Sequence, residues 1–157
     1  NWSLITLTCK NCEENQVSET LSLMAKAWNL TKQQRDIKPH KYVLVCFWAS
    51  WCKPCKEELP QLKKLYEKYN SKGLEIVSIS VDLQPVEWLE FTKANPLPWL
   101  SLWGDGHELT AKYDFQTIPF NIIADQDGKV IKRELYKEEI DKAVEELFLQ
   151  SNRRSIR

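Results

Sequence analysis

The sequence lacks an excess of either charge, a long apolar run and any repeat. Its 22 lysine and arginine residues balance 22 aspartate and glutamate residues, so nothing indicates nucleic acid or an acidic membrane surface as a partner. No apolar run reaches the roughly 18 residues that would span a bilayer, and no signal peptide is visible. A length of 157 residues, 43% of them hydrophobic, favours one domain with its own core.

The sequence also lacks an initiating methionine, because it begins with Asn1. We therefore expect a processed product or an excised piece, whose missing part would hold any targeting signal. The absence of a visible signal thus says little about the compartment.

Five cysteines stand at positions 9, 12, 46, 52 and 55, an odd number that cannot pair completely within one molecule. Four of them form two C-x-x-C pairs. This spacing suits redox chemistry or metal binding better than a long-range framework of structural disulfides.

Hydrophobic patterning predicts alternating strands and helices. Residues 42–48 and 74–81 are continuous apolar runs typical of buried strands. An amphipathic helix at 53–70 joins them, which implies a right-handed parallel crossover. Beyond these we expect helices at 86–94, 107–113 and 137–149, and strands at 99–103, 120–124 and 130–135.

The predicted fold class is α/β, with a central mixed β-sheet flanked by helices and a helical insert after the first βαβ unit. Asp127-Gly128 is a hairpin turn signal between the last two strands. We expect an N-terminal extension at 1–38, packed on the domain and carrying one helix at 17–29. The domain itself would span 39–150, followed by a frayed tail at 151–157.

The second C-x-x-C pair, Cys52-Lys53-Pro54-Cys55, stands where the first strand ends and a helix begins. Unpaired N–H groups and the positive end of the helix dipole stabilise a thiolate there, and the pKa of a cysteine in such a place falls from about 8.5 to between 3.5 and 7.5. Lys53 adds positive charge, and Pro54 stiffens the turn. We expect Cys52 to be the exposed nucleophile and Cys55 a buried resolving cysteine.

The phrase FWASWCKPCKEELP, placed between a strand and a helix, resembles the thioredoxin superfamily. Together with SVD at the end of the next strand, the insert at 83–103 and a later IP followed by DQDG, it looks like the TlpA/ResA-type thiol–disulfide oxidoreductases. The match covers about residues 42–149 and implies a thioredoxin-like fold.

The resemblance implies a protein disulfide oxidoreductase that needs no cofactor and no metal. Such proteins reduce cysteines of partner proteins, for example apocytochromes during cytochrome maturation, and an upstream thiol reductant restores them. They work in the bacterial cell envelope or periplasm and are often anchored to the membrane. Here an anchor would belong to a missing N-terminal part.

By position, the resemblance makes Cys52 and Cys55 the redox pair and Glu58 the acidic residue that tunes the thiol pKa. A carboxylate one turn after Cys55 can shuttle protons and raise nearby thiol pKa values, although Glu57 competes for this assignment. Ile118-Pro119 matches the cis-proline loop, which leaves the backbone before the proline free to pair with an extended substrate.

Substrate contacts are expected from Trp51, Lys53, Pro54 and Ile118, which flank the two cysteines or the cis-proline. Trp51 would cover the edge of the site, whereas Trp48 is expected in the core.

The sequence departs from the superfamily at Cys46, where thioredoxins carry a buried aspartate that helps the resolving cysteine to lose its proton. We interpret Cys46 as a small hydrophobe, which leaves more weight on Glu58. The N-terminal part also lacks the usual AP-x-F phrase and glycine-rich hairpin, although residues 4–7 suit an edge strand.

The first pair, Cys9-Lys10-Asn11-Cys12, stays open. It is compatible with idle thiols, a structural disulfide, a second redox pair that exchanges electrons with the first, or a zinc site shared with Cys52 and Cys55.

Two alternatives to the oxidoreductase also remain. A redox-inactive binding module would keep the fold without the chemistry, but retention of both cysteines argues against it. A thiol peroxidase would need its cysteine in a T-x-x-C phrase after a proline, and Cys52 is not so placed.

Overall fold

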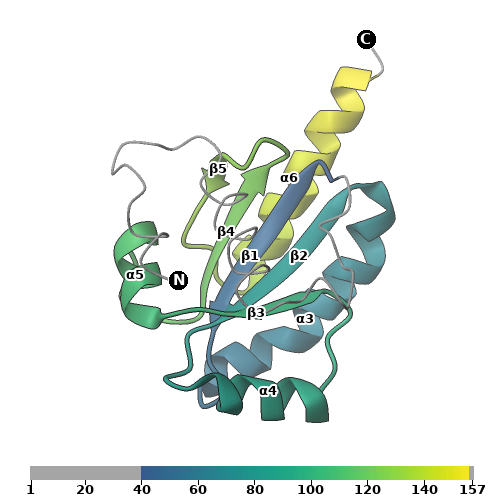
Figure 1. Ribbon diagram of the computed structural model, residues 1–157. Coiled ribbons are helices and arrows are strands. Elements are labelled where there is room, and N and C mark those ends of the chain that lie inside the picture. The colour runs from purple at the N-terminus through teal and green to yellow at the C-terminus, as the bar shows by residue number, and fades with distance from the viewer. Residues whose placement is uncertain (1–39, 156–157) are drawn as a thin grey trace.

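The computed structural model describes residues 40–155, whose centre is a twisted five-stranded sheet (Figure 1). The predicted helix at 17–29, the strand at 4–7 and the Cys9–Cys12 pair lie outside the described residues.

The sheet is mixed and has the strand order β3-β2-β1-β4-β5. Strands β3, β2 and β1 run parallel to one another. Strand β4 runs antiparallel to β1, and β5 runs antiparallel to β4. This arrangement confirms the predicted mixed sheet and parallel crossover. The strands are β1 (Tyr42–Trp48), β2 (Leu74–Ser80), β3 (Leu100–Trp103), β4 (Phe120–Asp125) and β5 (Val130–Lys132).

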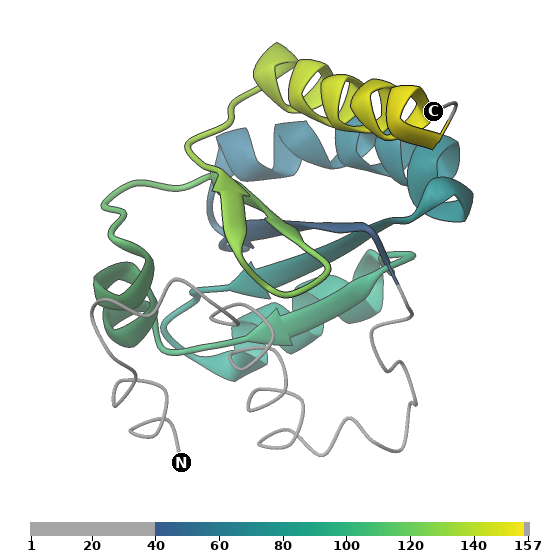
Figure 2. The same cartoon turned by 90° about the horizontal axis from the view of Figure 1, so that it is seen from above.

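Helices cover both faces of the sheet (Figure 2). Two long helices, α3 and α6, lie side by side on one face, and the two short helices α4 and α5 lie on the other side. Because α4 stands between β2 and β3, it is the predicted helical insert. The helices are α3 (Lys53–Tyr69), α4 (Pro85–Ala94), α5 (Gly106–Tyr113) and α6 (Glu138–Ser155).

Helix α3 begins at a side-chain cap and carries Pro54 in its first turn, where proline needs no hydrogen-bond partner for its nitrogen. The helix ends at Tyr69, close to the end of the predicted range 53–70, and a short 3₁₀ turn, Asn70–Lys72, follows it. Gly73 ends that turn with φ at 115°. A side chain is disfavoured there both by this backbone conformation and by Lys41, whose Cγ would lie 2.9 Å from an added Cβ.

The C-terminal hairpin turns at Gly128, with φ at 84°, as the Asp-Gly signal predicts. Strand β5 ends at Lys132, earlier than predicted. Glu134 has φ at 55°, which is incompatible with extended backbone. Helix α6 runs beyond its predicted end to Ser155, so the backbone of residues 151–155 is helical where the sequence suggests a frayed tail.

Alternate residues of each strand face opposite sides of the sheet, and two large clusters of buried side chains result. The cluster beside α5 includes Val45, Phe47 and Ile122, and the cluster beneath α3 and α6 includes Leu44, Leu62 and Val144. None of the helices within residues 40–155 is both long and apolar enough to cross a membrane.

Candidate active site

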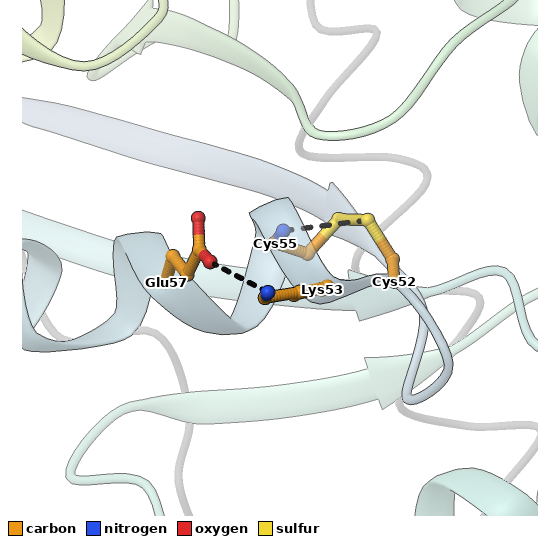
Figure 3. Close-up of polar contacts among 4 residues, drawn as sticks. All are labelled: Cys52, Lys53, Cys55 and Glu57. Atoms are coloured by element: carbon orange, nitrogen blue, oxygen red, sulfur yellow. Dashed lines mark hydrogen bonds and ion pairs between the residues drawn. A yellow bond between two sulfur atoms is a disulfide. The ribbon is translucent and has the colours of Figure 1, made fainter.

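A disulfide joins Cys52 and Cys55 at the point where the chain leaves β1 and enters α3 (Figure 3). The two Cα atoms are 5.3 Å apart, one helical turn along the chain. Cys52 is the residue before the helix, and its Sγ accepts a hydrogen bond from the backbone N–H of Cys55 at 3.3 Å. The sulfur therefore occupies the position where the helix offers its unpaired N–H groups.

Both cysteine side chains are 4% exposed, so the prediction that Cys52 is exposed is wrong. The Cys52 side chain turns inward to cap the helix and packs in a cluster with Trp48, Ala49 and Trp88. Trp48 is 4% exposed, which confirms its predicted place in the core.

The peptide bond between Ile118 and Pro119 is cis, as the resemblance implies. This loop faces the disulfide, because the Sγ of Cys52 lies 3.9 Å from the carbonyl oxygen of Ile118. Both loop residues are half-buried. The structure thus brings the two cysteines and the cis-proline loop together, although they are more than 60 residues apart in the sequence.

Three of the residues expected to contact substrate lie on the outer surface. Trp51 is 65% exposed, and Pro54 is exposed as well. The ammonium group of Lys53 lies 4.0 Å from a carboxylate oxygen of Glu57 on the next turn of α3 (Figure 3). These side chains form the accessible rim of a disulfide whose two cysteines are buried.

A buried carboxylate, Asp82, holds the loop that precedes the disulfide. Both its oxygens lie 3.1 Å from the backbone nitrogen of Ser50, which donates to them, and one accepts from the Ser50 hydroxyl at 2.8 Å. The Ser80 hydroxyl donates to the same carboxylate. The SVD phrase at 80–82 is visible in the sequence, but no local pattern predicts a role for Asp82. Only the folded chain shows that β2 ends beside the loop of Ser50.

Glu58 is the buried acid of α3, at 7% exposed, whereas the neighbouring Glu57 is exposed. The Nδ2 of Asn121 donates a hydrogen bond to Oε1 of Glu58 at 3.0 Å. Burial raises the pKa of Glu58 above its ordinary value, while the bond from Asn121 and the backbone N–H and charge of Lys137 act in the opposite direction. Of the two glutamates that compete in the sequence, Glu58 is therefore the one in a tuned environment.

Cys46 is a free, buried cysteine on β1. Burial, and to a lesser extent the nearby Glu58, raises the pKa of its thiol, so the thiol stays protonated and apolar, as its interpretation as a small hydrophobe requires. Its direct cross-strand partner is Asn121 on β4. Asn121 was not among the predicted site residues, and its place as a polar residue inside the apolar run FNIIA was the signal that could have identified it.

A cavity of about 600 Å³ opens beside the cis-proline and reaches Glu58. Its walls come from the start of α3, the cis-proline loop and the segment that leads into α6, and include Pro54, Glu57, Pro119, Tyr136 and Lys137. Glu58 thus has a route to solvent despite its burial. Among residues 40–155, no three His, Cys, Asp or Glu side chains are grouped to hold a metal ion, and a zinc site that uses Cys9 and Cys12 lies outside the described residues.

Known proteins with similar sequences carry thiol–disulfide oxidoreductase names. The chain is 34% identical over 110 residues to the thiol-disulfide oxidoreductase ResA of Bacillus thuringiensis subsp. konkukian, an alignment that covers 68% of this chain and 64% of that protein. It is 33% identical over 94 residues to the sporulation thiol-disulfide oxidoreductase A of Bacillus subtilis, covering 57% and 56% of the two chains. The chain therefore spans less than two thirds of the length of these relatives.

Solved structures agree with the sequence relatives. A thiol-disulfide oxidoreductase from Bacteroides fragilis superposes with a TM-score of 0.63 and 29% identity, over 73% of this chain and 87% of that one. The thioredoxin domain of a Bacteroides vulgatus thiol-disulfide oxidoreductase superposes with a TM-score of 0.63 and 27% identity, over 70% and 81%. The thioredoxin-like family model matches residues 40–130. This match covers more than half of the sequence and contains the disulfide and the cis-proline loop, and the chain therefore belongs to the thioredoxin-like family.

Proposed function

We propose that this chain is a thiol–disulfide oxidoreductase that reduces disulfides of partner proteins through a cycle of Cys52 and Cys55. The observation that carries the proposal is the disulfide at the N-terminus of α3, facing the cis-peptide bond before Pro119. Relatives that share this part of the chain bear the same activity in their names. The working unit would be the domain at 39–150.

In the proposed cycle, the reduced protein begins with two thiols. The thiolate of Cys52 attacks one sulfur of the partner's disulfide, which forms a mixed disulfide and releases the partner's other sulfur as a thiolate that takes up a proton. Cys55 then loses its proton and attacks the Sγ of Cys52. The partner leaves as a dithiol, and this protein is left with the Cys52–Cys55 disulfide. An upstream thiol reductant supplies two electrons and two protons to restore it.

The surrounding residues have distinct proposed roles. The N-terminus of α3 stabilises the Cys52 thiolate through its backbone N–H groups. Glu58, one turn after Cys55, accepts the proton that Cys55 must lose, and its raised pKa brings it closer to the working range of such a base. Glu58 would then release that proton to solvent through the cavity that reaches it.

Substrate binding is assigned to the rim of the site. The backbone of Ile118, before the cis-Pro119, would pair with an extended segment of the partner. Trp51, Lys53 and Pro54 are accessible beside it and would contact the segment that carries the partner's disulfide. We place this activity in the bacterial cell envelope, in line with the resemblance to ResA-type proteins, and apocytochromes are one class of partner to test.

The test is a disulfide-exchange assay with dithiothreitol as the upstream reductant and a disulfide-bonded protein as substrate. Cys52→Ser is expected to abolish turnover, and Cys55→Ser to trap the substrate as a mixed disulfide with Cys52. Cys46→Ala is the matched control, because Cys46 is a free, buried cysteine that takes no part in the disulfide, and it should retain turnover. Absence of turnover by the wild-type protein would overturn the proposal in favour of a binding module, and full turnover by Cys52→Ser would contradict the role of Cys52 as nucleophile.

The direction of electron flow needs a separate measurement, the reduction potential of Cys52–Cys55 against a dithiothreitol or glutathione series. A reducing protein should give a value near the roughly −270 mV of thioredoxin, and a value near −120 mV would indicate an oxidant. Repeating the measurement with a Cys9→Ser/Cys12→Ser variant would show whether the first pair takes part.

A further inference from the structure

The buried face of β4 carries an amide that contacts the acid proposed to serve the disulfide. Asn121 is fully buried, and its Nδ2 donates both to Oε1 of Glu58, at 3.0 Å, and to the backbone carbonyl oxygen of Leu135, at 2.9 Å. Both protons of the amide nitrogen are thus used on acceptors. The Oδ1 of the same side chain is buried without a hydrogen-bond partner.

The bond to Leu135 fixes which way the amide points. If the amide turned over, Oδ1 would face the carbonyl oxygen of Leu135, and two acceptors would meet in a buried place. The orientation with Nδ2 toward Glu58 is therefore held by the backbone, and Asn121 can act on Glu58 only as a donor. A donor stabilises the ionised carboxylate and does not satisfy the proton of the neutral acid.

We propose that Asn121 is a positioning residue that keeps the Glu58 carboxyl in place, one turn along α3 from Cys55, and favours its ionised form. An orphaned Oδ1 is the cost of this arrangement, since an unsatisfied buried acceptor destabilises the fold. The cost indicates that the side chain is set by its contact with Glu58, because an apolar residue would pack in the same strand position without it. The inference deepens the proposed function, in which Glu58 serves the thiols.

Other charged or titratable groups also face Glu58 and set the background for this effect. Cys46 faces it from β1, and Cys55 lies one turn before it on α3. Lys137 acts on it through its N–H and charge. The remaining groups line the cavity beside the cis-proline that reaches Glu58, and they are Glu57, Tyr136, Glu138 and Asp141. These groups are the same with and without the Asn121 amide. A variant at Asn121 therefore measures the effect of the amide donor alone on the titration of Glu58.

The direct test is the titration of the Glu58 side chain, followed by its ¹³Cδ chemical shift. Asn121→Leu replaces the amide with an apolar side chain of similar size and so removes the donor. We expect the acid dissociation constant of Glu58 to fall about tenfold, because a hydrogen bond to a charged group is lost in a buried place. An unchanged Glu58 titration in Asn121→Leu would overturn the proposal, since removal of a purely structural asparagine would not change the pKa of Glu58.

A matched control exists on the same fold. Asn70 also donates its Nδ2 to a backbone carbonyl oxygen, that of Leu74, at 3.0 Å, but contacts no carboxylate in the described structure. Asn70→Ala should leave the Glu58 titration unchanged. If Asn121→Leu does not fold, the wild-type protein still decides the matter. The side-chain amide resonances of Asn121 should titrate with the same midpoint as Glu58, and amide shifts that do not respond there would contradict the proposal.

The consequence for the thiols separates this inference from the proposed function. In the reduced protein, the pH profile of Cys52 alkylation should contain a Glu58-dependent inflection, which Asn121→Leu moves to higher pH. In a Glu58→Gln background the Asn121 substitution should have no effect on the profile. A wild-type profile without this inflection would contradict the role assigned to Glu58. The Asn121 proposal would still be decided by the carboxyl titration.

Discussion

The two faces of the central sheet are built from the same strands and differ in chemistry. On the side of α5, Phe47 of β1 pairs in register with Phe120 of β4, and both rings pack on Phe115. One residue earlier on β1 and one later on β4, Cys46 pairs in register with Asn121, on the side of α3. Aromatic packing thus lies directly opposite a buried thiol and a buried amide.

The two faces therefore differ in polarity at the centre of the β1–β4 pair. The face beneath α5 is an aliphatic and aromatic cluster that serves packing. The other face carries Glu58 and Asn121 beneath the helix whose first turn bears the disulfide. Because a buried polar group destabilises unless it is hydrogen-bonded, this placement is best understood as a functional requirement of the proposed redox site.

Phe47→Ala should have the largest effect of the substitutions we consider. The ring is fully buried and contacts three other rings, those of Tyr113, Phe115 and Phe120. Removing it should lower the free energy of unfolding by about 3–5 kcal/mol, measured by urea denaturation of the disulfide form. A loss below about 1 kcal/mol would mean that the aromatic face contributes little to stability, and the contrast between the faces would be lost.

Asp82→Ala should have the next largest effect. It would leave the partly buried N–H of Ser50 and the buried hydroxyl of Ser80 without their acceptor, at a cost of about 1–3 kcal/mol. The same urea experiment measures it, with Ser50→Ala as the milder comparison. Equal stability of Asp82→Ala and wild type would show that polar burial at the site end of the sheet serves no structural purpose.

Glu58→Gln should have a smaller effect on the magnitude of the unfolding free energy than on the way in which that free energy depends on pH. The folded pKa of Glu58 is raised above its ordinary value of 4.5, with burial as the main cause. The neutral form is therefore favoured in the folded state, so this stability contribution is present below pH 4.5 and is lost as the pH rises through the folded pKa. Glutamine does not ionise, so the variant does not lose this stability as the pH rises.

The measurement is urea denaturation of wild type and Glu58→Gln from about pH 4 to pH 8. The difference between the two proteins should grow in favour of the variant as the pH rises above 4.5. A difference that is constant with pH would mean that Glu58 is not perturbed by its buried surroundings, and the polar face would then resemble ordinary surface.

Glu57→Gln should have the smallest effect. Glu57 is exposed, and its 4.0 Å ion pair with Lys53 is surrounded by solvent, so the change in unfolding free energy should stay within about 0.5 kcal/mol. It is the matched control for Glu58→Gln, one position along the same helix. If both variants gave the same pH dependence, burial would not distinguish the two acids.

Much of the fold was predictable because it depends on local patterns. Apolar runs of strand length located β1 and β2, and the Asp127-Gly128 turn located the last hairpin. The cis bond before Pro119 followed from resemblance to a family. The ends of the last two elements were less accurate, since β5 stops at Lys132 and α6 continues to Ser155. A local pattern does not contain the tertiary packing on which such ends depend.

What the sequence determined by itself is the chemistry available, namely two cysteines spaced three apart at the start of a helix after a buried strand. The tertiary structure alone decided the surroundings. It buried Cys52 and Glu58, left Glu57 exposed, and brought Asn121 to Glu58 and Asp82 to the loop of Ser50 from distant parts of the chain. The physical reason is that burial and hydrogen bonding are properties of packed neighbours. Here those neighbours come from strand register and helix placement, which join segments more than 30 residues apart.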